Sequence, residues 1–442
     1  MRQRLGRLTR DFHLLWAGET IGNVGDRVTL FVVPTLMVFA LGASAFDIGL
    51  VSMAQYVAIP VLSLVAGALV DRWDVRHLLI ACDLVRAAAV VLIPIAYWQG
   101  FLGVPLLFLC VATVSAATVF FNIGYIPALS SIVDAPDLVR ANSRLEGSRT
   151  VSELGGPALA GWLYQLVGAG ALLVDAFSYL FSAAAFRAMR PFAVTPVRST
   201  QIRARLALGI RLNWTDPILR RSTAGTLLAN IGGPIFVTQM PVLAYQGLHL
   251  SAATFGTVMS IAALGAVLGA VLAPIVSRRL GSGRMLGLSM VCHSAAGLGI
   301  LAVPTFPGAI VLCGTLALYG FFFTWYNINS QSVRQTRAPI ADQAVIHGAY
   351  RTVTWGVIPI SAFVGGWVVT RLSGSLGVLD AAKFTMLAAT VIGISSILPL
   401  ARMQHWLETA PPMRSPEERA AAPVDTDTDA DADADAIVAA TT

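Results

Sequence analysis

Residues 67–98 read GALVDRWDVRHLLIACDLVRAAAVVLIPIAYW, and this stretch decides the fold. A charged loop around Asp71 and Arg72 is followed by an apolar run at 77–98. This run is long enough to cross the hydrocarbon core of a bilayer as a helix. The same alternation of short polar loops and apolar runs continues in both directions along the chain. We therefore expect a polytopic membrane protein.

The composition supports this expectation. Hydrophobic residues make up 56% of the chain and charged residues only 12%, about half of the charged fraction usual in soluble domains. Backbone groups inside hydrocarbon must bond within their own segment, which favours helices. Twelve runs are predicted as transmembrane helices in an all-α membrane protein. They lie at 12–41, 47–70, 77–98, 104–133, 147–169, 171–189, 219–244, 252–276, 284–304, 307–331, 348–370 and 380–400.

Basic residues lie in alternate loops, and nearly all of them are arginines, since Lys383 is the single lysine. Cytoplasmic loops of membrane proteins carry such an excess of basic charge. The pattern predicts a bacterial inner (plasma) membrane protein with both termini in the cytoplasm. We expect no nucleic-acid partner, because the arginines lie in short loops between apolar runs.

The two halves of the chain resemble each other. A shift of 207 residues aligns the Ala-Gly-x4-Asn-x-Gly pattern at 17–25 with that at 224–232. A shift of 202 residues aligns Arg-Thr-Val-x5-Pro at 149–157 with 351–359. These matches predict two pseudo-symmetric six-helix bundles, with a substrate site between them near the middle of the membrane.

Four regions are predicted on this basis. Residues 1–189 form the N-terminal six-helix bundle, 190–217 an arginine-rich cytoplasmic central loop, and 218–403 the C-terminal bundle. Residues 404–442 form an acidic, repetitive tail, whose composition predicts a disordered cytoplasmic segment.

The loop at 67–76 resembles the loop signature of the major facilitator superfamily, a Gly-x-Leu-x-Asp-Arg-x-Gly-Arg-Arg pattern. The matching residues are Gly67, Leu69, Asp71, Arg72 and Arg76. Asp74 and Val75 depart from the pattern, and an Asp at that place is similar to the drug-efflux branch with macrolide and siderophore exporters. The resemblance implies a latch made by Gly67, Asp71, Arg72 and Arg76, which closes the cytoplasmic side. The alternative is that these charges only set the topology.

A second motif lies in the predicted fifth helix, at 155–161, and reads GGPALAG. It resembles the family's Gly-Pro-x-x-Gly-Gly antiporter motif, which implies export rather than import. The residues concerned are Gly155, Gly156, Pro157 and Gly161. Small residues also permit close packing between helices, so a packing role alone is the alternative.

Ionisable groups inside the membrane are the strongest functional signal, because each costs several kcal/mol unless it is paired or hydrated. Glu19, Asn23 and Asp26 share one face of the first helix. We expect Asp26 to be the first candidate for a protonatable coupling group and Glu19 the second. The alternative for Asp26 is a structural contact with an arginine.

Two further acidic residues are coupling candidates with structural alternatives. Asp83 lies three residues before Arg86, and Glu153 lies four residues after Arg149, so each can form a pair along its helix. Asp175, near the outer end of the sixth helix, is interpreted as an interfacial residue.

The aromatic stretch at 321–329 and the stretch at 120–125 are placed opposite each other by the repeat. Aromatic walls with a few amides suit large, partly apolar ligands. The predicted substrate-cavity residues are Asn23, Arg27, Asn122, Tyr125, Asn230, Trp325, Tyr326 and Asn327. Packing against protein or lipid is the alternative for each aromatic residue.

The leading hypothesis is a secondary transporter that exports hydrophobic or amphiphilic compounds in exchange for protons by alternating access. A phosphate-binding loop needs Gly-Lys-Ser/Thr, and Lys383 is followed by Phe384. We expect no enzyme activity, no cofactor and no metal site, and a monomer whose partners are a small-molecule substrate, protons and the lipid bilayer. The alternatives are an uncoupled facilitator or importer of a small solute and a non-transporting membrane sensor or assembly factor.

Overall fold

The computed structural model describes residues 8–70, 73–133, 137–190, 202–303, 306–339, 342–411 and 413, and this part of the chain contains helices and no strand. The long helices of the first half are α1 (Arg10–Phe39), α2 (Ala45–Val70), α3 (Val75–Trp98), α4 (Val104–Ile132), α5 (Leu138–Val167) and α6 (Leu172–Ala188). Those of the second half are α8 (Pro217–Thr238), α9 (Ala252–Leu280), α10 (Ser282–Ala296), α11 (Gly308–Arg337), α12 (Gln343–Gly356), α13 (Ile358–Leu376) and α14 (Val378–Ile394). Shorter elements are η2 (Gly168–Ala171), α7 (Ile202–Thr215), η3 (Val242–Gly247), η4 (Gly297–Ala302), α15 (Ile397–Leu400) and α16 (Met403–Thr409).

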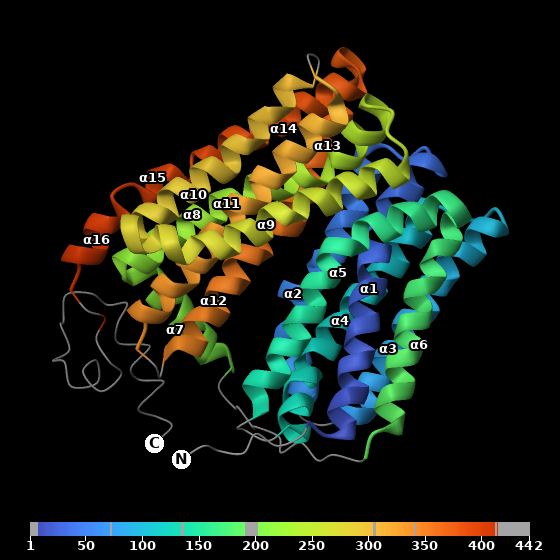
Figure 1. The fold of residues 1–442 in the computed structure, drawn as a ribbon, viewed down its shortest axis with the longest axis horizontal. Helices are drawn as coiled ribbons and strands as arrows, with labels where there is room; N and C mark the ends of the chain where they lie inside the picture. The colour runs from blue at the N-terminus through green and yellow to red at the C-terminus, as the bar shows by residue number, and fades with distance from the viewer. Residues whose placement is uncertain are drawn as a thin grey trace.

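Eleven stretches of the described residues are long and apolar enough to cross a membrane. One of them, Arg140–Ala188, contains both α5 and α6, and the chain reverses direction between these helices at η2 (Figure 1). The eleven stretches become twelve when α5 and α6, which has 17 residues, are counted separately, and the number of twelve passes stays a prediction. The predicted all-α membrane fold is confirmed.

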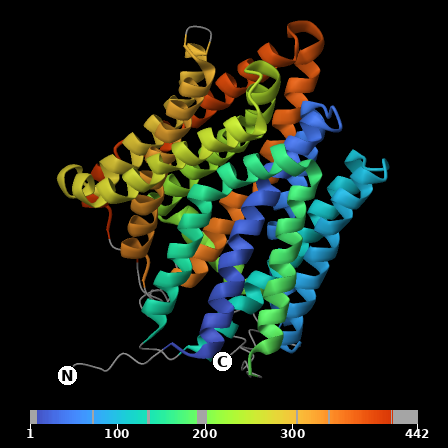
Figure 2. The same ribbon diagram turned by 45° about the vertical axis from the view of Figure 1, so that its right-hand side comes forward.

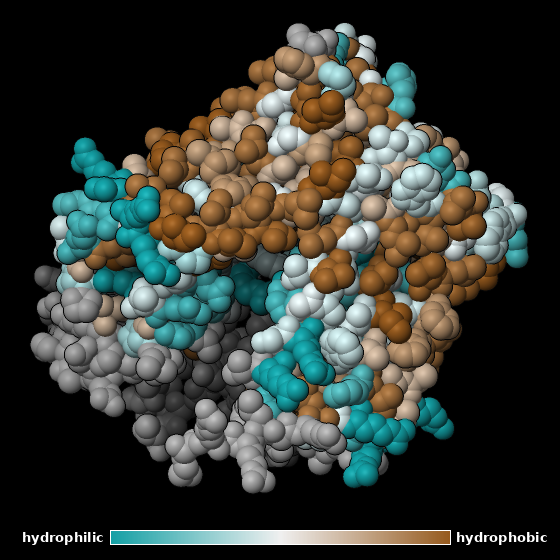
Figure 3. Space-filling view, in the orientation of Figure 1, coloured by the Kyte–Doolittle hydropathy of each residue, from teal (hydrophilic) through white to brown (hydrophobic). Residues whose placement is uncertain are grey.

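The helices form two bundles that follow the chain (Figure 1). In the N-terminal bundle, α1 packs on α5 and α6, α3 on α4 and α6, and α2 on α4. In the C-terminal bundle, α9 packs on α11, α10 on α11 and α14, and α8 on α13 and α14. The outer surface is strongly apolar (Figure 3), with Leu398 74% and Ile310 69% exposed. Such a surface needs a nonpolar solvent, which the bilayer supplies.

Two boundaries differ from those predicted. The central segment at 190–217 contains a helix, α7, which packs on α12 and α8. The C-terminal bundle extends to Thr409, because α16 continues past residue 403 and buries Met403. Apolar side chains stabilise both helices. The charged residues of these segments make that apolar pattern hard to recognise in the sequence. The predicted disordered tail otherwise lies outside the described residues, apart from 410, 411 and 413.

The two bundles are joined by two helix crossings, α2 on α13 and α5 on α9. Small residues allow the backbones to touch there. A Cβ on Gly49 would lie 2.7 Å from the carbonyl oxygen of Ala362, and a Cβ on Gly256 would overlap the carbonyl oxygen of Pro157. We call this contact region the seam, and it consists of Ala45, Gly49, Pro157, Gly161, Ala252, Gly256, Ala362 and Gly366.

The seam is pseudo-symmetric. Gly49 and Gly256 occupy equivalent places and are separated by the predicted offset of 207 residues. Gly161 and Gly366 are also equivalent, but they are separated by 205 residues. The predicted offset of 202 is therefore wrong for this pair of helices at the seam. The difference coincides with a break at Val357, where α12 ends and α13 begins.

Hydrogen bonds between the bundles reinforce the seam. The backbone N–H of Ala158 donates to the hydroxyl oxygen of Ser260 at 2.9 Å. The backbone N–H of Phe46 donates to the hydroxyl oxygen of Thr370 at 2.9 Å. A buried hydrogen bond of 2.7 Å also joins the hydroxyl groups of Thr35 and Tyr245.

The seam lies at the end of the molecule where α1 ends and α2 begins. Towards the opposite end, where α1 begins, the bundles diverge (Figure 1), and a second view turned by 45° shows the same arrangement (Figure 2). The face drawn in Figure 3 is hollowed between the diverging bundles, and hydrophilic residues border the hollow. The structure is thus closed at the seam and open at the end that carries the predicted basic loops, which we call the arginine-rich end.

We predict that Gly256→Ala weakens the seam, because the new methyl group meets the backbone of Pro157. Overpacking of this kind costs about 1–3 kcal/mol. Spin labels at Gln99 and Ser375, which are exposed on the two bundles beyond the seam, should then report longer distances. Gly314→Ala is the control, because a Cβ there meets nothing within 4 Å. Equal distance distributions in the two variants would contradict the assigned role of the seam.

Candidate functional site

A cavity of about 300 Å³ opens inside the N-terminal bundle between α1, α2, α3, α4 and α6. Most of its wall is aliphatic, from residues such as Leu30, Val33 and Ile93. Its polar lining consists of Asn23, Asp26, Arg27, Thr29, Ser52, Gln55, Ser115, Thr118, Asn122 and Tyr179. An apolar cavity with a few convergent polar groups is the usual form of a small-molecule site.

The structure brings four of the predicted residues to this cavity. Asn23, Asp26 and Arg27 on α1 and Asn122 on α4 all line it. Tyr125 does not line the cavity, because its ring stacks on Phe121 with centroids 6.0 Å apart. The α1 face selected from the sequence therefore points to the interior of its bundle.

Asp26 is held by a tyrosine. The hydroxyl of Tyr179 on α6 donates a hydrogen bond of 2.6 Å to the Oδ1 atom of Asp26. Both residues line the cavity, and the ring of Tyr179 is 3% exposed. No ion pair joins Asp26 to an arginine among the described residues, since the neighbouring Arg27 turns to Glu153, but the buried Arg86 interacts with Asp26 electrostatically, so the structural alternative stays open. The donor to the Asp26 carboxylate is therefore a neutral hydroxyl.

The ring of Tyr179 also covers a buried arginine. The guanidinium of Arg86 on α3 lies between two aromatic rings, 4.2 Å from the centroid of Phe121 and 4.4 Å from that of Tyr179. Such stacking stabilises a desolvated cation by about 2 kcal/mol or more. Tyr179 therefore contacts Arg86 through its ring and Asp26 through its hydroxyl.

Arg86 pairs with Asp83, as expected from their spacing. The side chains are 6% and 0% exposed, respectively, so the pair is shielded from solvent. Within a low-dielectric interior, a lone charge costs several kcal/mol, and pairing offsets part of that cost. The contacts run in order from Asp26 to Tyr179, Arg86 and Asp83.

Asp175 is buried, so its interpretation as an interfacial residue is wrong. Its side chain is 0% exposed and accepts hydrogen bonds from the hydroxyls of Thr29 and Ser178. The close approach of α1 and α6 depends on Gly25, because a Cβ there would lie 2.9 Å from the Cα of Asp175. The residue faces α1 rather than the membrane surface.

Glu153 forms two ion pairs. It accepts from Arg27 at 2.6 Å, and Arg149 lies 3.5 Å away, as the predicted spacing allows. Its side chain is 39% exposed, so this contact is worth little to stability. Glu19 is half-buried, interacts electrostatically with Arg86, Asp26 and Asp83, and does not line the cavity.

The predicted cavity residues of the second half do not join this site. Trp325 is buried and donates to the carbonyl oxygen of Gly269 at 2.8 Å. Tyr326 is also buried and bonds to the hydroxyl of Thr226. Asn230 donates to the carbonyl oxygen of Thr354 at 2.7 Å, while Asn327 is exposed. Trp325 and Tyr326 therefore pack inside the C-terminal bundle in this conformation.

The predicted latch is described only in part. Asp71 and Arg72 lie outside the described residues, as do the surroundings of Gly67. Arg76 donates from Nε to the carbonyl oxygen of Phe186 at 3.0 Å, so it closes the end of α6 in its own bundle. Asp74 caps α3, and the hydrogen bond from the His77 N–H lowers the pKa of Asp74 below its ordinary value.

The antiporter-like motif on α5 contacts two neighbours. A Cβ on Gly156 would lie 2.5 Å from the Cβ of Arg27, so this glycine makes room for the Arg27 side chain. Gly161 and Pro157 contact α9 across the seam, whereas Gly155 has open space around it. One motif thus links the cavity lining on α1 with the contact between the bundles.

Tyr179 was missed by the sequence reasoning. It follows Asp175 by four residues, and Ser178 and Ser182 extend the same polar face of an otherwise apolar helix. This polar stripe on α6 was the feature of the sequence that could have identified Tyr179. Among the described residues, no group of three or more His, Cys, Asp or Glu side chains is arranged to hold a metal ion.

Solved structures share the overall fold. The nucleoside transporter NupG superposes with a TM-score of 0.66 at 15% identity, covering 89% of this chain and 100% of that chain. A bacterial homologue of the lysosomal transporter Spinster, in an inward-facing and unoccupied conformation, superposes with a TM-score of 0.68 at 13% identity. It covers 90% of this chain and 97% of that one. These likenesses concern the fold alone.

Two curated relatives are transporters. The multidrug efflux pump Tap of Mycolicibacterium fortuitum is 27% identical over 369 residues, which cover 80% of this chain and 87% of Tap. The staphyloferrin A transporter of Staphylococcus aureus is 24% identical over 322 residues, or 71% of this chain and 76% of that protein. The Major Facilitator Superfamily profile matches residues 15–362. The chain therefore belongs to the major facilitator superfamily of membrane transporters.

Proposed function

We propose that this transporter exports hydrophobic or amphiphilic compounds from the bacterial cytoplasm in exchange for protons. The observation that carries the proposal is Asp26, a carboxylate on the wall of a mostly aliphatic cavity that accepts a hydrogen bond from the hydroxyl of a tyrosine. A compound with a cationic group and an apolar body matches this lining. A proton on the same carboxylate would compete with such a compound.

The arrangement around Asp26 favours one coupling site over the other candidates. Asp83 is paired with Arg86 and shielded from solvent, so we assign it a structural role. Glu153 is paired with Arg27 and is partly exposed. Glu19 does not line the cavity. Asp26 alone among the four candidate carboxylates lines the cavity, and it forms no ion pair within 4 Å among the described residues.

Alternating access follows from the packing between the bundles. In the present conformation, the seam closes one end and the arginine-rich end is open. The basic loops are proposed to face the cytoplasm, so this is an inward-open state that takes up substrate from the cell interior. Protonation of Asp26 and loading of a cationic substrate would each neutralise the Asp26 carboxylate, and the state with this carboxylate charged and without substrate would be the form that resists closing.

The distant relatives support export without establishing it. Tap is named a multidrug efflux pump, and its match spans most of both chains. An uncoupled facilitator is the second candidate, favoured by the finding that Asp26 is the single carboxylate among the described residues that line the cavity. Proton-coupled export depends on the proton gradient across the membrane, whereas an uncoupled facilitator does not. The dependence of transport on that gradient therefore separates the two candidates.

We expect Asp26→Asn to abolish proton-driven efflux, because the amide cannot exchange a proton. The measurement is the efflux of the lipophilic cation ethidium from an efflux-deficient bacterial host, with and without a protonophore. Wild type should lower ethidium accumulation, and the protonophore should raise it. Asp380→Asn is the control, since Asp380 is exposed and lies outside the cavity. Protonophore-sensitive efflux by Asp26→Asn at normal expression would refute the coupling role.

The Asp83–Arg86 pair should behave as a structural unit. Arg86→Gln leaves the buried carboxylate of Asp83 without its cation, which costs about 3–5 kcal/mol. The double variant Asp83→Asn/Arg86→Gln removes both charges and should recover much of that loss. Thermal unfolding of the purified variants measures both effects. A single variant as stable as wild type would show that the pair does not anchor the bundle.

A further inference from the structure

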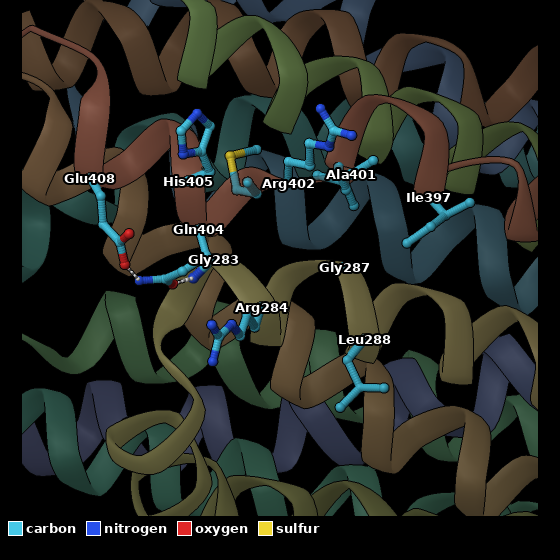
Figure 4. Close-up of a pocket in the computed structure, with 12 residues that line it drawn as sticks. Gly283, Arg284, Gly287, Leu288, Ile397, Ala401, Arg402, Gln404, His405 and Glu408 are labelled. Atoms are coloured by element: carbon cyan, nitrogen blue, oxygen red, sulfur yellow. Dashed lines mark hydrogen bonds between the residues drawn. The ribbon is translucent and has the colours of Figure 1, made fainter.

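A second cavity lies at the arginine-rich end of the C-terminal bundle, far along the chain from the site around Asp26. Its volume is about 380 Å³, within the usual range for ligand pockets. The first turns of α10 form one wall, and α15 and α16 form the other (Figure 4). Neither the family assignment nor the transport proposal gives this cavity a role.

Two arginines from different elements line this cavity. Arg284 lies in the first turn of α10, and Arg402 lies between α15 and α16 (Figure 4). No hydrogen bond or ion pair joins either guanidinium to another described residue. Arg402 adopts a φ of 58°, an unusual conformation for a residue other than glycine, at the point where the chain leaves α15.

One side of the cavity is apolar and faces outward. Leu288 is 45% exposed and Ile397 is 36% exposed, and both line the cavity. Leu398, the next residue of α15, is 74% exposed. Exposed aliphatic side chains on membrane-spanning helices face the acyl chains of lipids. The cavity therefore lies between aliphatic side chains that face lipid and the two arginines at the end of the bundle.

The opposite side is polar and internally bonded. The amide oxygen of Gln404 accepts from the N–H of Gly283 at 3.0 Å, and its amide nitrogen donates to Glu408 at 2.7 Å (Figure 4). These bonds fix α16 against the start of α10. Trp406 on α16 lies 3.9 Å beneath the guanidinium of Arg221, which ties α16 to α8 as well. The single carboxylate, Glu408, leaves the lining with an excess of one positive charge.

We propose that this cavity binds the phosphate headgroup of an anionic phospholipid. The exposed side chains of Arg284 and Arg402 point to opposite sides in Figure 4, and both would turn towards the phosphate oxygens when the lipid binds. The acyl chains would run along Leu288 and Ile397. Guanidinium groups bind phosphate through paired, charge-assisted hydrogen bonds. Basic pockets between transmembrane helices at the cytoplasmic surface bind anionic headgroups by the same chemistry. A bound lipid would hold α10, α15 and α16 together at the open end of the transporter.

Native mass spectrometry of the purified full-length chain tests this proposal. The protein is mixed with phosphatidylglycerol and phosphatidylcholine of the same acyl chains, and the lipids that remain bound are counted. Wild type should retain phosphatidylglycerol in preference to phosphatidylcholine. Arg284→Gln/Arg402→Gln should lower that preference roughly tenfold or more. Arg278→Gln/Arg279→Gln is the matched control, since these arginines are exposed at the end of α9 and do not line the cavity.

Equal preferences in the two double variants would overturn the proposal, because the charge alone would then explain the binding. Glu408→Gln keeps a hydrogen-bonding partner for Gln404 and removes the negative charge, so phosphatidylglycerol retention should rise. A fall in that variant would also contradict the site. A final arm adds glycerol 3-phosphate, and its displacement of the lipid at equal concentration would assign the cavity to a soluble phosphate compound instead.

Discussion

The buried cation of Arg86 is the interaction on which the N-terminal bundle depends. A guanidinium within an apolar bundle must be neutralised, and Asp83 does so from one turn away on the same helix. The two aromatic rings that cover it come from α4 and α6, so the cation fixes three helices together. Because one of those rings belongs to Tyr179, the anchor also sets the position of the hydroxyl that bonds Asp26.

This anchor connects the cavity to the movement proposed for transport. Asp26 lies on α1, and its neighbour Arg27 packs against Gly156 of α5. The carbonyl of the next residue, Pro157, and Gly161 further along α5 contact α9 across the seam. The change of charge proposed for Asp26 would therefore occur close to the helix that crosses between the bundles. The seam consists of small residues, so its two pairs of helices pack closely without long side chains that interlock. This suits a contact that must open and close.

Much of the fold follows from local patterns in the sequence. Apolar runs of about 20 residues and the alternation of arginine-rich loops are sufficient to predict the helices and the two halves. The spacing of Asp83 and Arg86 likewise predicts their pairing, because neighbours on one helix face meet whatever the bundle does. Errors occurred where an apolar face was short or hidden by charges, as in α7 and α16, and where Asp175 was judged only from its place along a helix.

The candidate site was less predictable, for a physical reason. The contact between Tyr179 and Asp26 joins residues 153 positions apart, and it depends on how α1, α3 and α6 are rotated about their axes. Hydropathy sets the length of a membrane helix but leaves its rotation weakly specified when nearly all faces are apolar. The same uncertainty explains Trp325 and Tyr326, which were expected at a cavity and are enclosed in the C-terminal bundle.

Substrate-driven proton movement in proteoliposomes tests the central claim most directly. The purified protein is reconstituted with a pH-sensitive dye in the lumen, and an ethidium gradient is applied without a pre-formed pH gradient. The account predicts that ethidium entering through wild type drives protons out of the lumen, so the luminal pH rises. It also predicts that Asp26→Asn abolishes this change. Ethidium movement through wild type with no change in luminal pH would contradict proton exchange at this site.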